Sequence, residues 1–418
     1  MNARELLGEY GSPAYVYDLG EVRTSLEMLR GALPRGSVVY YSLKANPHPA
    51  LVRELVRLGC RAEVCSPGEL ATSLSAGAQP GDVLYTGPGK SRAEVRNALS
   101  RGVTHFSVDS ADDVAKVAEL AEEAGVRVDL LLRINPDRPV PGLGLTMCGG
   151  PSQFGADAAT VLGDPQAFRG TPWARVTGCH VYMGTNITET ETLLATFRTA
   201  LELAVEVCAA VGVEPEIVDL GGGFGHPFAH PGPRHDFAAL REPLEALLDE
   251  RLPGWRQGRT KVAFESGRYL VAASGSLLAT VEDVKTSKDR PFVVLDTGIH
   301  HLGGMSGLRR VPSVAAGALA EEETGETLDR ATLVGPLCTP LDYLARETEL
   351  PAVRRGDAVR IPNVGAYGLT ASLVAFLSRD PPVEIVVDGG EVVDATRLCI
   401  ARHAAERRHS HSPRSIFA

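Results

Sequence analysis

The sequence lacks any apolar run long enough to cross a bilayer, and its first residues, MNARELLGEYGSP, carry no basic and apolar segment typical of a secretory signal. It is also poor in positive charge, because 42 Lys and Arg face 52 Asp and Glu, for a net charge of -10. The phosphates of nucleic acids and of anionic membranes repel such a chain. We therefore expect a cytoplasmic protein that binds neither nucleic acid nor membrane.

Paired cysteines are absent as well. The seven cysteines are an odd number and none belongs to a CxxC pair, so the sequence indicates neither a disulfide framework nor a zinc site. A reducing compartment fits this pattern best. The chain also has no Walker loop and no dinucleotide-binding glycine fingerprint. We expect no metal site.

What the chain does contain is a long alternation of short apolar runs and amphipathic stretches. With 418 residues and 44% hydrophobic content, it is long enough for two domains. About eight strand-then-helix units lie between residues 36 and 264, which is typical of an α/β fold with a closed (β/α)8 barrel of the TIM type. We assign residues 20–270 to this barrel.

Beyond the barrel the sequence turns to short β-rich segments without long helical patterns. We interpret residues 271–400, together with residues 1–19, as an antiparallel β-domain. Residues 401–418 are polar and low in complexity, so we expect a disordered tail. Histidines in the tail could bind a metal, but a solvated tail is the simpler interpretation.

Barrel enzymes carry their catalytic groups at the C-terminal ends of the strands, so residues that follow the apolar runs are the first candidates. Lys44 directly follows the run at 37–42. Partial desolvation at a strand end lowers the pKa of a lysine and makes its amine a nucleophile, although a surface lysine in a turn is the ordinary alternative. The glycines at 221–225 could wrap a phosphate with backbone N–H groups, or only form a tight turn.

Three further positions have side chains suited to catalysis or cofactor binding. Glu265 ends the last barrel strand, and a buried carboxylate there could hold the proton on a pyridine nitrogen, unless it only pairs with Arg268. Cys338 lies in a loop between two prolines and is a candidate general acid, unless it is a buried, inert thiol. The Tyr367 hydroxyl could contact a phosphate, or its ring could pack in the core.

Taken in order, these motifs resemble the barrel-fold (fold-type III) pyridoxal-phosphate (PLP) decarboxylases of the diaminopimelate and ornithine decarboxylase family. The resemblance runs from about residue 13 to about residue 376. The motifs that carry it lie at residues 41–46, 62–69, 153–155, 218–223, 265–268, 296–298, 335–338 and 365–368. It implies PLP as the cofactor and a homodimer with shared active sites.

The resemblance also implies a role for each candidate. Lys44 would hold PLP as a Schiff base, and Glu265 would pair with the pyridine nitrogen. Cys338 would enter the active site from the partner subunit and return a proton to the carbanion. The phosphate would be bound by Gly222, Gly223, the backbone of Gly267 and Arg268, and Tyr367.

Two departures from the family pattern concern the cofactor ring and the substrate. The family's ring-stacking histidine falls at Tyr182, with His180 beside it, so either side chain could stack on PLP. The acid that pairs with the distal ammonium of the substrate, Glu in diaminopimelate decarboxylases and Asp in ornithine decarboxylases, falls at Thr339. An ammonium facing threonine loses a charge-assisted hydrogen bond worth roughly 1.5–3 kcal/mol, which argues against diamino acids unless Asp342 takes over that contact.

Residues 180–185, 265–270 and 337–340 resemble a biosynthetic subgroup of the family. It includes the butirosin-pathway decarboxylase, which acts on a glutamyl group tethered to an acyl carrier protein. A tethered substrate needs no distal-ammonium site, and Arg309 and Arg310 are candidates for a basic rim around its phosphopantetheine arm, although a solvated basic pair is the commoner explanation. We therefore expect a PLP-dependent amino-acid decarboxylase of secondary metabolism, such as antibiotic biosynthesis.

Several alternatives stay open. A decarboxylase of free diaminopimelate, ornithine or a siderophore intermediate would use the same chemistry. A PLP racemase pairs the ring nitrogen with arginine, so Glu265 argues against it. A non-catalytic PLP-binding regulator is usually a single small barrel, so the β-domain and Cys338 argue against that function.

Overall fold

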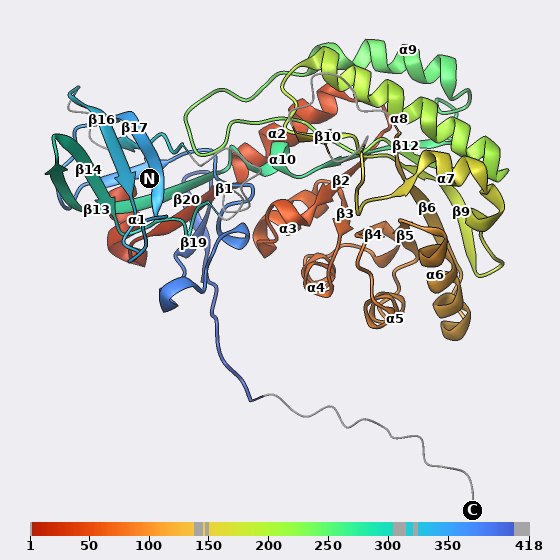
Figure 1. Ribbon diagram of the computed structural model, residues 1–418, viewed down its shortest axis with the longest axis horizontal. Helices are drawn as coiled ribbons and strands as arrows, with labels where there is room; N and C mark the ends of the chain where they lie inside the picture. The colour runs from red at the N-terminus through yellow and green to blue at the C-terminus, as the bar shows by residue number, and fades with distance from the viewer. Residues whose placement is uncertain (1, 138–144, 147–149, 304–314, 321–324, 405–418) are drawn as a thin grey trace, which may run out of the picture.

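The chain forms a barrel and a separate β-domain, seen on the right and the left of Figure 1. The structure is a computed structural model, which describes residues 2–137, 145–146, 150–303, 315–320 and 325–404. Most of the tail expected to be disordered, and the candidate rim residues Arg309 and Arg310, lie outside these ranges. No helix within them is long and apolar enough to cross a membrane.

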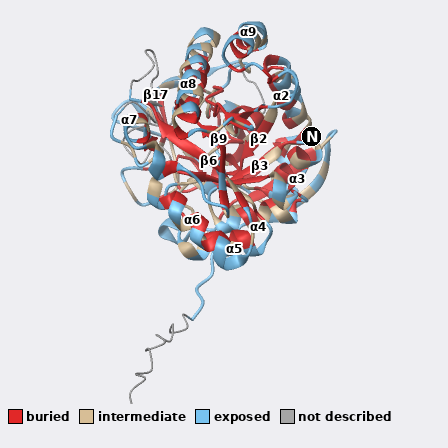
Figure 2. Ribbon diagram, turned by 90° about the vertical axis from the view of Figure 1, so that its right-hand side faces the viewer, coloured by how far each residue is buried: buried red, intermediate tan, exposed pale blue. Residues whose placement is uncertain are grey.

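Eight parallel strands form the barrel, as the alternation of apolar runs predicts. Their order is β5-β4-β3-β2-β12-β11-β9-β6, and pairing of β5 with β6 closes the ring. Nearly all strand residues are buried (Figure 2). Helices cover the outer face of such a barrel, and side chains fill its interior. The strands are β2 (Val38–Ser42), β3 (Arg61–Val64), β4 (Val83–Tyr85), β5 (His105–Val108), β6 (Val128–Asn135), β9 (Ala174–His180), β11 (Ile217–Asp219) and β12 (Lys261–Ser266).

Helices connect the barrel strands on the outside. Three of them begin at a serine, Ser66, Ser91 or Ser110, whose hydroxyl accepts an N–H of the first helical turn. The helices are α2 (Leu19–Ala32), α3 (Pro49–Arg57), α4 (Pro67–Ser75), α5 (Arg92–Ser100), α6 (Ala111–Ala124), α7 (Ala158–Gly163), α8 (Thr190–Val211), α9 (Arg241–Arg251) and α10 (Arg268–Val271). Two-residue strands, β7 (Leu145–Thr146), β8 (Ala156–Asp157) and β10 (Gly184–Thr185), lie in the loops.

The second domain is built on a sheet that includes the early strand β1 (Ala14–Asp18), as expected. Its order is β17-β16-β14-β13-β1-β19-β20, and β18 pairs with β13 and β15. The further elements are α1 (Ala3–Tyr10), β13 (Gly275–Ser287), β14 (Arg290–Leu295), β15 (Leu319–Ala320), β16 (Thr327–Val334), β17 (Tyr343–Pro351), β18 (Ala358–Ile361), β19 (Val383–Asp388) and β20 (Glu391–Arg397).

This sheet is mixed, which corrects the prediction of a purely antiparallel one. Strand β1 runs parallel to β19, and β14 runs parallel to β16. Only hairpin neighbours are forced to be antiparallel by their short turn. The whole barrel lies between β1 and β19 in the sequence, so the chain has room to return in either direction.

Candidate active site

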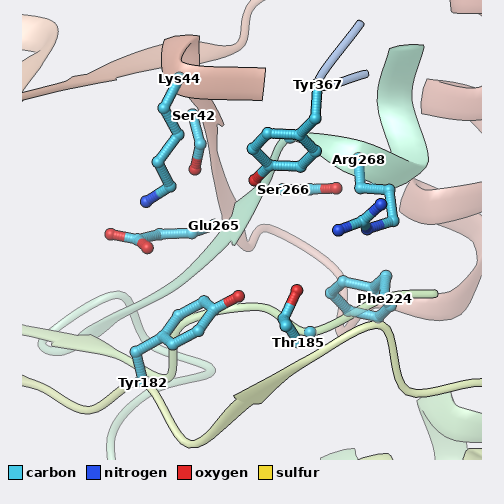
Figure 3. A pocket seen from close by; sticks show the side chains of 11 residues that line it. Ser42, Lys44, Tyr182, Thr185, Phe224, Glu265, Ser266, Arg268 and Tyr367 are labelled. Carbon is cyan, nitrogen blue, oxygen red and sulfur yellow. The ribbon is translucent and has the colours of Figure 1, made fainter. Parts of the chain in front are cut away.

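One cavity opens at the C-terminal ends of the barrel strands and brings most of the expected residues together (Figure 3). The empty space between its lining residues, including open solvent at the mouth, is about 310 Å³. The barrel supplies all of its walls except Tyr367, which comes from the C-terminal domain. The lining residues are Ser42, Lys44, Tyr182, Thr185, Gly223, Phe224, Glu265, Ser266, Gly267, Arg268 and Tyr367.

Lys44 enters the cavity from a 3-10 turn (Leu43–Ala45) that follows β2. Its Nζ lies 3.2 Å from each carboxylate oxygen of Glu63 on β3. Desolvation alone would lower the pKa of Lys44, but the negative charges of Glu63 and Glu265 outweigh it and raise that pKa above its ordinary value. The prediction of a lowered pKa is therefore wrong, because the neighbouring strand ends supply acids as well as apolar side chains.

Glu63 itself is buried and held in place. The Thr86 hydroxyl donates a 2.6 Å hydrogen bond to its Oε1. Burial would raise the pKa of Glu63, but the positive charge of Lys44 and the hydrogen bonds from neighbouring hydroxyls lower it below its ordinary value. Glu63 is thus an ionised partner of fixed orientation for the Lys44 ammonium.

The glycine loop after β11 packs closely against its neighbours. A Cβ on Gly222 would overlap the carbonyl oxygen of Glu265, and a Cβ on Gly223, where φ is +107°, would lie 2.9 Å from the carbonyl oxygen of Gly184. Among the described residues, no acceptor is found for the backbone N–H groups of Gly222, Gly223 and Phe224. The loop therefore offers adjacent donors to an anion in the cavity.

Arg268 and Tyr367 approach the cavity beside this loop. The Arg268 guanidinium carbon lies 4.8 Å from the centre of the Tyr367 ring. The Tyr367 N–H donates to the carbonyl oxygen of Ala45 at 2.7 Å, which ties the second domain to the lysine turn. Ser266 Oγ and Arg268 Nε are buried and lack hydrogen-bond partners in the described parts of the chain. A cation and unpaired donors at this place favour an anionic group such as a phosphate.

Glu265 forms another wall of the cavity, and His180 and Asp219 lie behind it. His180 Nε2 lies 3.3 Å from Glu265 Oε1, although the two are not aligned as a hydrogen bond. Burial and the charges of Glu63 and Asp219 raise the pKa of Glu265 well above its ordinary value. Burial raises the pKa of Asp219 to about 7. Burial also lowers the pKa of His180 well below its ordinary value, so this ring is neutral.

These three side chains also have the spacing of metal ligands, which the sequence analysis did not predict. One ligand-type atom of each, from His180, Asp219 and Glu265, lies within 4.8 Å of the others. Of the three, only Glu265 lines the cavity, so a group bound there meets one carboxylate. A pyridine nitrogen needs only one carboxylate and can share its proton, so we interpret the trio as one end of an organic cofactor site.

Tyr182 lines the cavity, whereas His180 does not. Lys44 Nζ lies 5.9 Å from the centre of the Tyr182 ring. The same ring covers the glycine loop, where a Cβ on Gly221 would lie 2.9 Å from it. Burial raises the pKa of the Tyr182 hydroxyl to about 12, so it is a neutral phenol. Of the two rings considered for stacking on a cofactor, Tyr182 is therefore the one in reach.

The loop that carries Cys338 and Thr339 lies outside this cavity. Residues around Cys338 line a different hollow on the β-domain, beside β14 and β16. The thiol is exposed, so the alternative of a buried, inert cysteine is wrong. Within one chain, the candidate acid and the candidate lysine are not brought together.

Asp342 holds this loop in shape. Its two carboxylate oxygens accept the N–H groups of Ile299 and Leu337, each at 2.8 Å. A Cβ on Gly298 or Gly335 would overlap the same carboxylate. Asp342 thus holds the backbone of its own loop, and its contact with a distal ammonium stays a prediction.

Three buried residues of the site were not singled out from the sequence: Glu63, Ser107 and Asp219. Each lies on a barrel strand, on β3, β5 and β11, with its side chain directed inward. The rule that selected Lys44, namely polar residues near the C-terminal end of an apolar run, could have found Glu63 and Asp219. Ser107 has no such signal, because a small hydroxyl in a strand is ordinary.

The chain is similar to known pyridoxal-dependent enzymes. Residues 19–272 match the family described as pyridoxal-dependent decarboxylase, pyridoxal binding domain. The chain is 31% identical over 389 residues to L-glutamyl-[BtrI acyl-carrier protein] decarboxylase of Niallia circulans, covering 92% of this chain and 91% of that protein. It is 32% identical over 404 residues to diaminopimelate decarboxylase of Methanothermobacter thermautotrophicus, covering 94% and 90%.

The fold is also that of a solved structure. Diaminopimelate decarboxylase from Helicobacter pylori, complexed with L-lysine, superimposes with a TM-score of 0.80 at 24% identity, covering 94% of this chain and 95% of that one. This similarity and the strand order confirm the predicted barrel with its separate β-domain.

Proposed function

Because the chain belongs to the pyridoxal-dependent decarboxylases, we propose that it releases CO2 from an L-amino-acyl substrate whose far end carries no ammonium group. PLP is its cofactor and decarboxylation its chemistry, as the sequence predicts. A glutamyl group on an acyl carrier protein is our first choice of substrate, since an enzyme named for that substrate is 31% identical over 92% of this chain. Such a substrate would belong to secondary metabolism.

The cavity has the donors and acceptors that PLP requires. Glu265 lines the cavity, and its carboxylate would face the pyridine nitrogen. Lys44 would hold the cofactor covalently through Nζ, and Tyr182 would cover the face of its ring. The phosphate would be held by the N–H groups of Gly222 and Gly223, the backbone of Gly267, the Arg268 guanidinium and the Tyr367 hydroxyl.

When bound, PLP withdraws electrons from the α-carbon of a linked amino acid, which lets the carboxyl group leave as CO2. The chain's own residues provide the setting for this reaction. Glu63 holds the Nζ proton of Lys44 and orients the amine. Glu265, once ionised, would keep a proton on the pyridine nitrogen, and Tyr182 would shield one face of the ring from water.

Cys338 would return a proton to the α-carbon, and a second copy of the chain would bring it there. Its thiol is exposed, and residues 335–342 do not line the cavity of their own chain. We therefore infer a homodimer in which this loop of one copy completes the cavity of the other. An acyl carrier protein would be the second partner.

The loop at 335–342 offers a distal ammonium no acid except Asp342, which already holds the loop backbone, and this observation carries the proposal about the substrate. Thr339 is neutral, and both oxygens of Asp342 accept backbone N–H groups. The distal ammonium of a diamino acid would lose a charge-assisted hydrogen bond worth roughly 1.5–3 kcal/mol, or one to two orders of magnitude in selectivity. A substrate whose far end is uncharged has no such hydrogen bond to lose.

Free diaminopimelate is the second candidate substrate. The chain is as similar to a diaminopimelate decarboxylase, at 32% identity, as to the enzyme for the tethered glutamyl group. A carboxylate from another part of the homodimer would then have to meet the distal ammonium.

The test offers the purified holoenzyme four substrates: L-glutamyl-carrier protein, free L-glutamate, diaminopimelate and L-ornithine. CO2 release and the mass of each product are recorded. We expect loss of one CO2 from the carrier-bound species alone. Turnover of diaminopimelate or ornithine would overturn the proposal of an uncharged substrate end.

Thr339→Glu tests the loop directly. A carboxylate at this position should raise turnover of diaminopimelate by roughly tenfold or more, because it restores the charge-assisted hydrogen bond. Thr327→Glu is the matched control, since Thr327 is exposed at the start of β16 in the same domain. Equal effects of the two substitutions would mean that position 339 does not meet the substrate.

A further inference from the structure

A chain of polar contacts crosses the barrel interior behind Glu265. Ser107 Oγ on β5 lies 2.9 Å from His180 Nδ1 at the end of β9. On the other side of the imidazole, Nε2 lies 3.3 Å from Glu265 Oε1 on β12. All three side chains are buried, but only Glu265 lines the cavity. His180 therefore touches the cavity wall from behind and cannot itself contact a ligand there.

The contact between His180 and Glu265 is incomplete as it stands. Within the described chain, Nε2 and Oε1 are both buried atoms without a hydrogen-bond partner. Buried polar atoms are rarely left unpaired, because nothing replaces the water that they lose. Since the two atoms are only 3.3 Å apart, a small rotation of the carboxylate would align them. The arrangement thus indicates that the hydrogen bond between His180 Nε2 and Glu265 Oε1 forms when the Glu265 carboxylate rotates to meet a ligand.

We propose that His180 is a positioning residue that holds the Glu265 carboxylate toward the cavity, and that Ser107 sets the His180 tautomer required for this. The Ser107 hydroxyl can donate to Nδ1, which leaves the single proton of a neutral imidazole on Nε2, facing Glu265. This inference rests on the proposed placement of a pyridine nitrogen at Glu265.

A neutral imidazole suits this role better than a cation. A positive charge on His180 would compete with a protonated pyridine nitrogen for the Glu265 carboxylate. Burial lowers the pKa of His180, and the nearby cations Arg133, Lys44 and Lys90 lower it further. His180 can therefore donate a hydrogen bond without neutralising its acceptor.

Glu265 needs such a donor because its surroundings oppose its ionisation. Burial and the negative charges of Glu63 and Asp219 raise the pKa of Glu265, while Lys44 and Arg133 only partly offset them. A hydrogen bond from Nε2–H stabilises the ionised carboxylate, which is the form that holds a proton on a pyridine nitrogen.

Two substitutions of similar size separate positioning from packing. His180→Gln can place an amide N–H where Nε2 lies, whereas His180→Asn can reach Ser107 but not Glu265. We would measure the dissociation constant of PLP from each holoenzyme by equilibrium dialysis, and the pH dependence of the absorbance of the bound cofactor. We expect His180→Gln to stay within roughly threefold of the parent and His180→Asn to bind at least about tenfold more weakly.

The Ser107 contact is tested in the same way. Ser107→Ala removes the hydroxyl and should weaken PLP binding by several fold, whereas Ser107→Thr keeps the hydroxyl and should restore it. Thermal unfolding of each dialysed variant controls for folding. If His180→Asn does not fold, the two Ser107 variants decide, and equal behaviour of these two would overturn the proposal.

Each outcome separates this inference from the function on which it rests. Equal losses in His180→Gln and His180→Asn would assign His180 to packing alone and overturn the positioning role. If Glu265→Gln leaves PLP affinity and absorbance unchanged, the placement of the pyridine nitrogen fails instead. If Glu265→Gln weakens binding and His180→Asn does not, only the present inference fails.

Discussion

Glu63 sets the protonation of Lys44, and Glu63→Gln removes its charge while keeping its shape. Lys44 Nζ lies 3.2 Å from both Glu63 oxygens. At an effective dielectric constant of ~20, a pair of unit charges at this separation interacts by about 5 kcal/mol, or about four pKa units. The Lys44 side chain is 41% exposed, so solvent screens much of this interaction. We expect the pKa of Lys44 to fall by roughly one to two units.

The assay is the rate at which added PLP forms the proposed link to Lys44 in protein freed of cofactor, followed by absorbance as a function of pH. Only the neutral amine reacts, so the rate near neutral pH should rise by up to about tenfold for each unit by which the pKa falls. Glu384→Gln is the matched control, because Glu384 is also buried but lies in the other domain, where it accepts a hydrogen bond from Tyr17. An unchanged pH profile in Glu63→Gln, or an equal change in Glu384→Gln, would refute the reasoning.

Three further substitutions have outcomes that the structure defines. Gly223→Ala places a Cβ 2.9 Å from the Gly184 carbonyl oxygen, at a residue whose φ is +107°. We expect the free energy of unfolding, measured by urea titration, to fall by about 1–3 kcal/mol. We also expect weaker PLP binding, measured by equilibrium dialysis. Asp342→Asn puts an amide N–H group against a backbone N–H donor, so we expect the free energy of unfolding in urea to fall by about 3 kcal/mol. An unchanged free energy would contradict the role of Asp342 in holding the loop at 335–342. Burial raises the pKa of Glu384 from 4.5 to about 7, so its contribution to stability is present below pH 4.5 and is lost as the pH rises through 7. Glu384→Gln should therefore gain up to about 3 kcal/mol over the parent between pH 5 and pH 8, and a constant difference across that range would exclude this group as the cause.

The sequence alone determined the architecture, because the pattern of apolar residues is a local property of each element. The alternation of apolar runs and amphipathic stretches predicts the barrel and its strand ends. The same kind of pattern marks α2, which the sequence analysis does not include: Val22, Leu26 and Leu29 recur at helical spacing and are all buried. The β-domain was also predicted, but its parallel pairs were not, because strand direction there depends on long connections and not on composition.

The residues of the cavity were largely predictable as well. Lys44, Tyr182, Gly223, Glu265 and Tyr367 all line it, as expected from strand ends, glycines and motif order. The four barrel positions follow from the barrel geometry, since the C-terminal ends of all strands meet at one face, whereas Tyr367 comes from the other domain. The placement of Cys338 outside the cavity of its own chain agrees with a site that needs a second copy.

Only the tertiary structure decided how these groups interact. Glu63 lies 19 residues from Lys44 and reverses the predicted direction of its pKa shift. Ser107 lies 73 residues from His180, yet the two meet inside the barrel. A pKa or a tautomer depends on distances of a few ångströms between side chains on different strands. The sequence specifies which strands exist, but those distances are set only when the barrel closes.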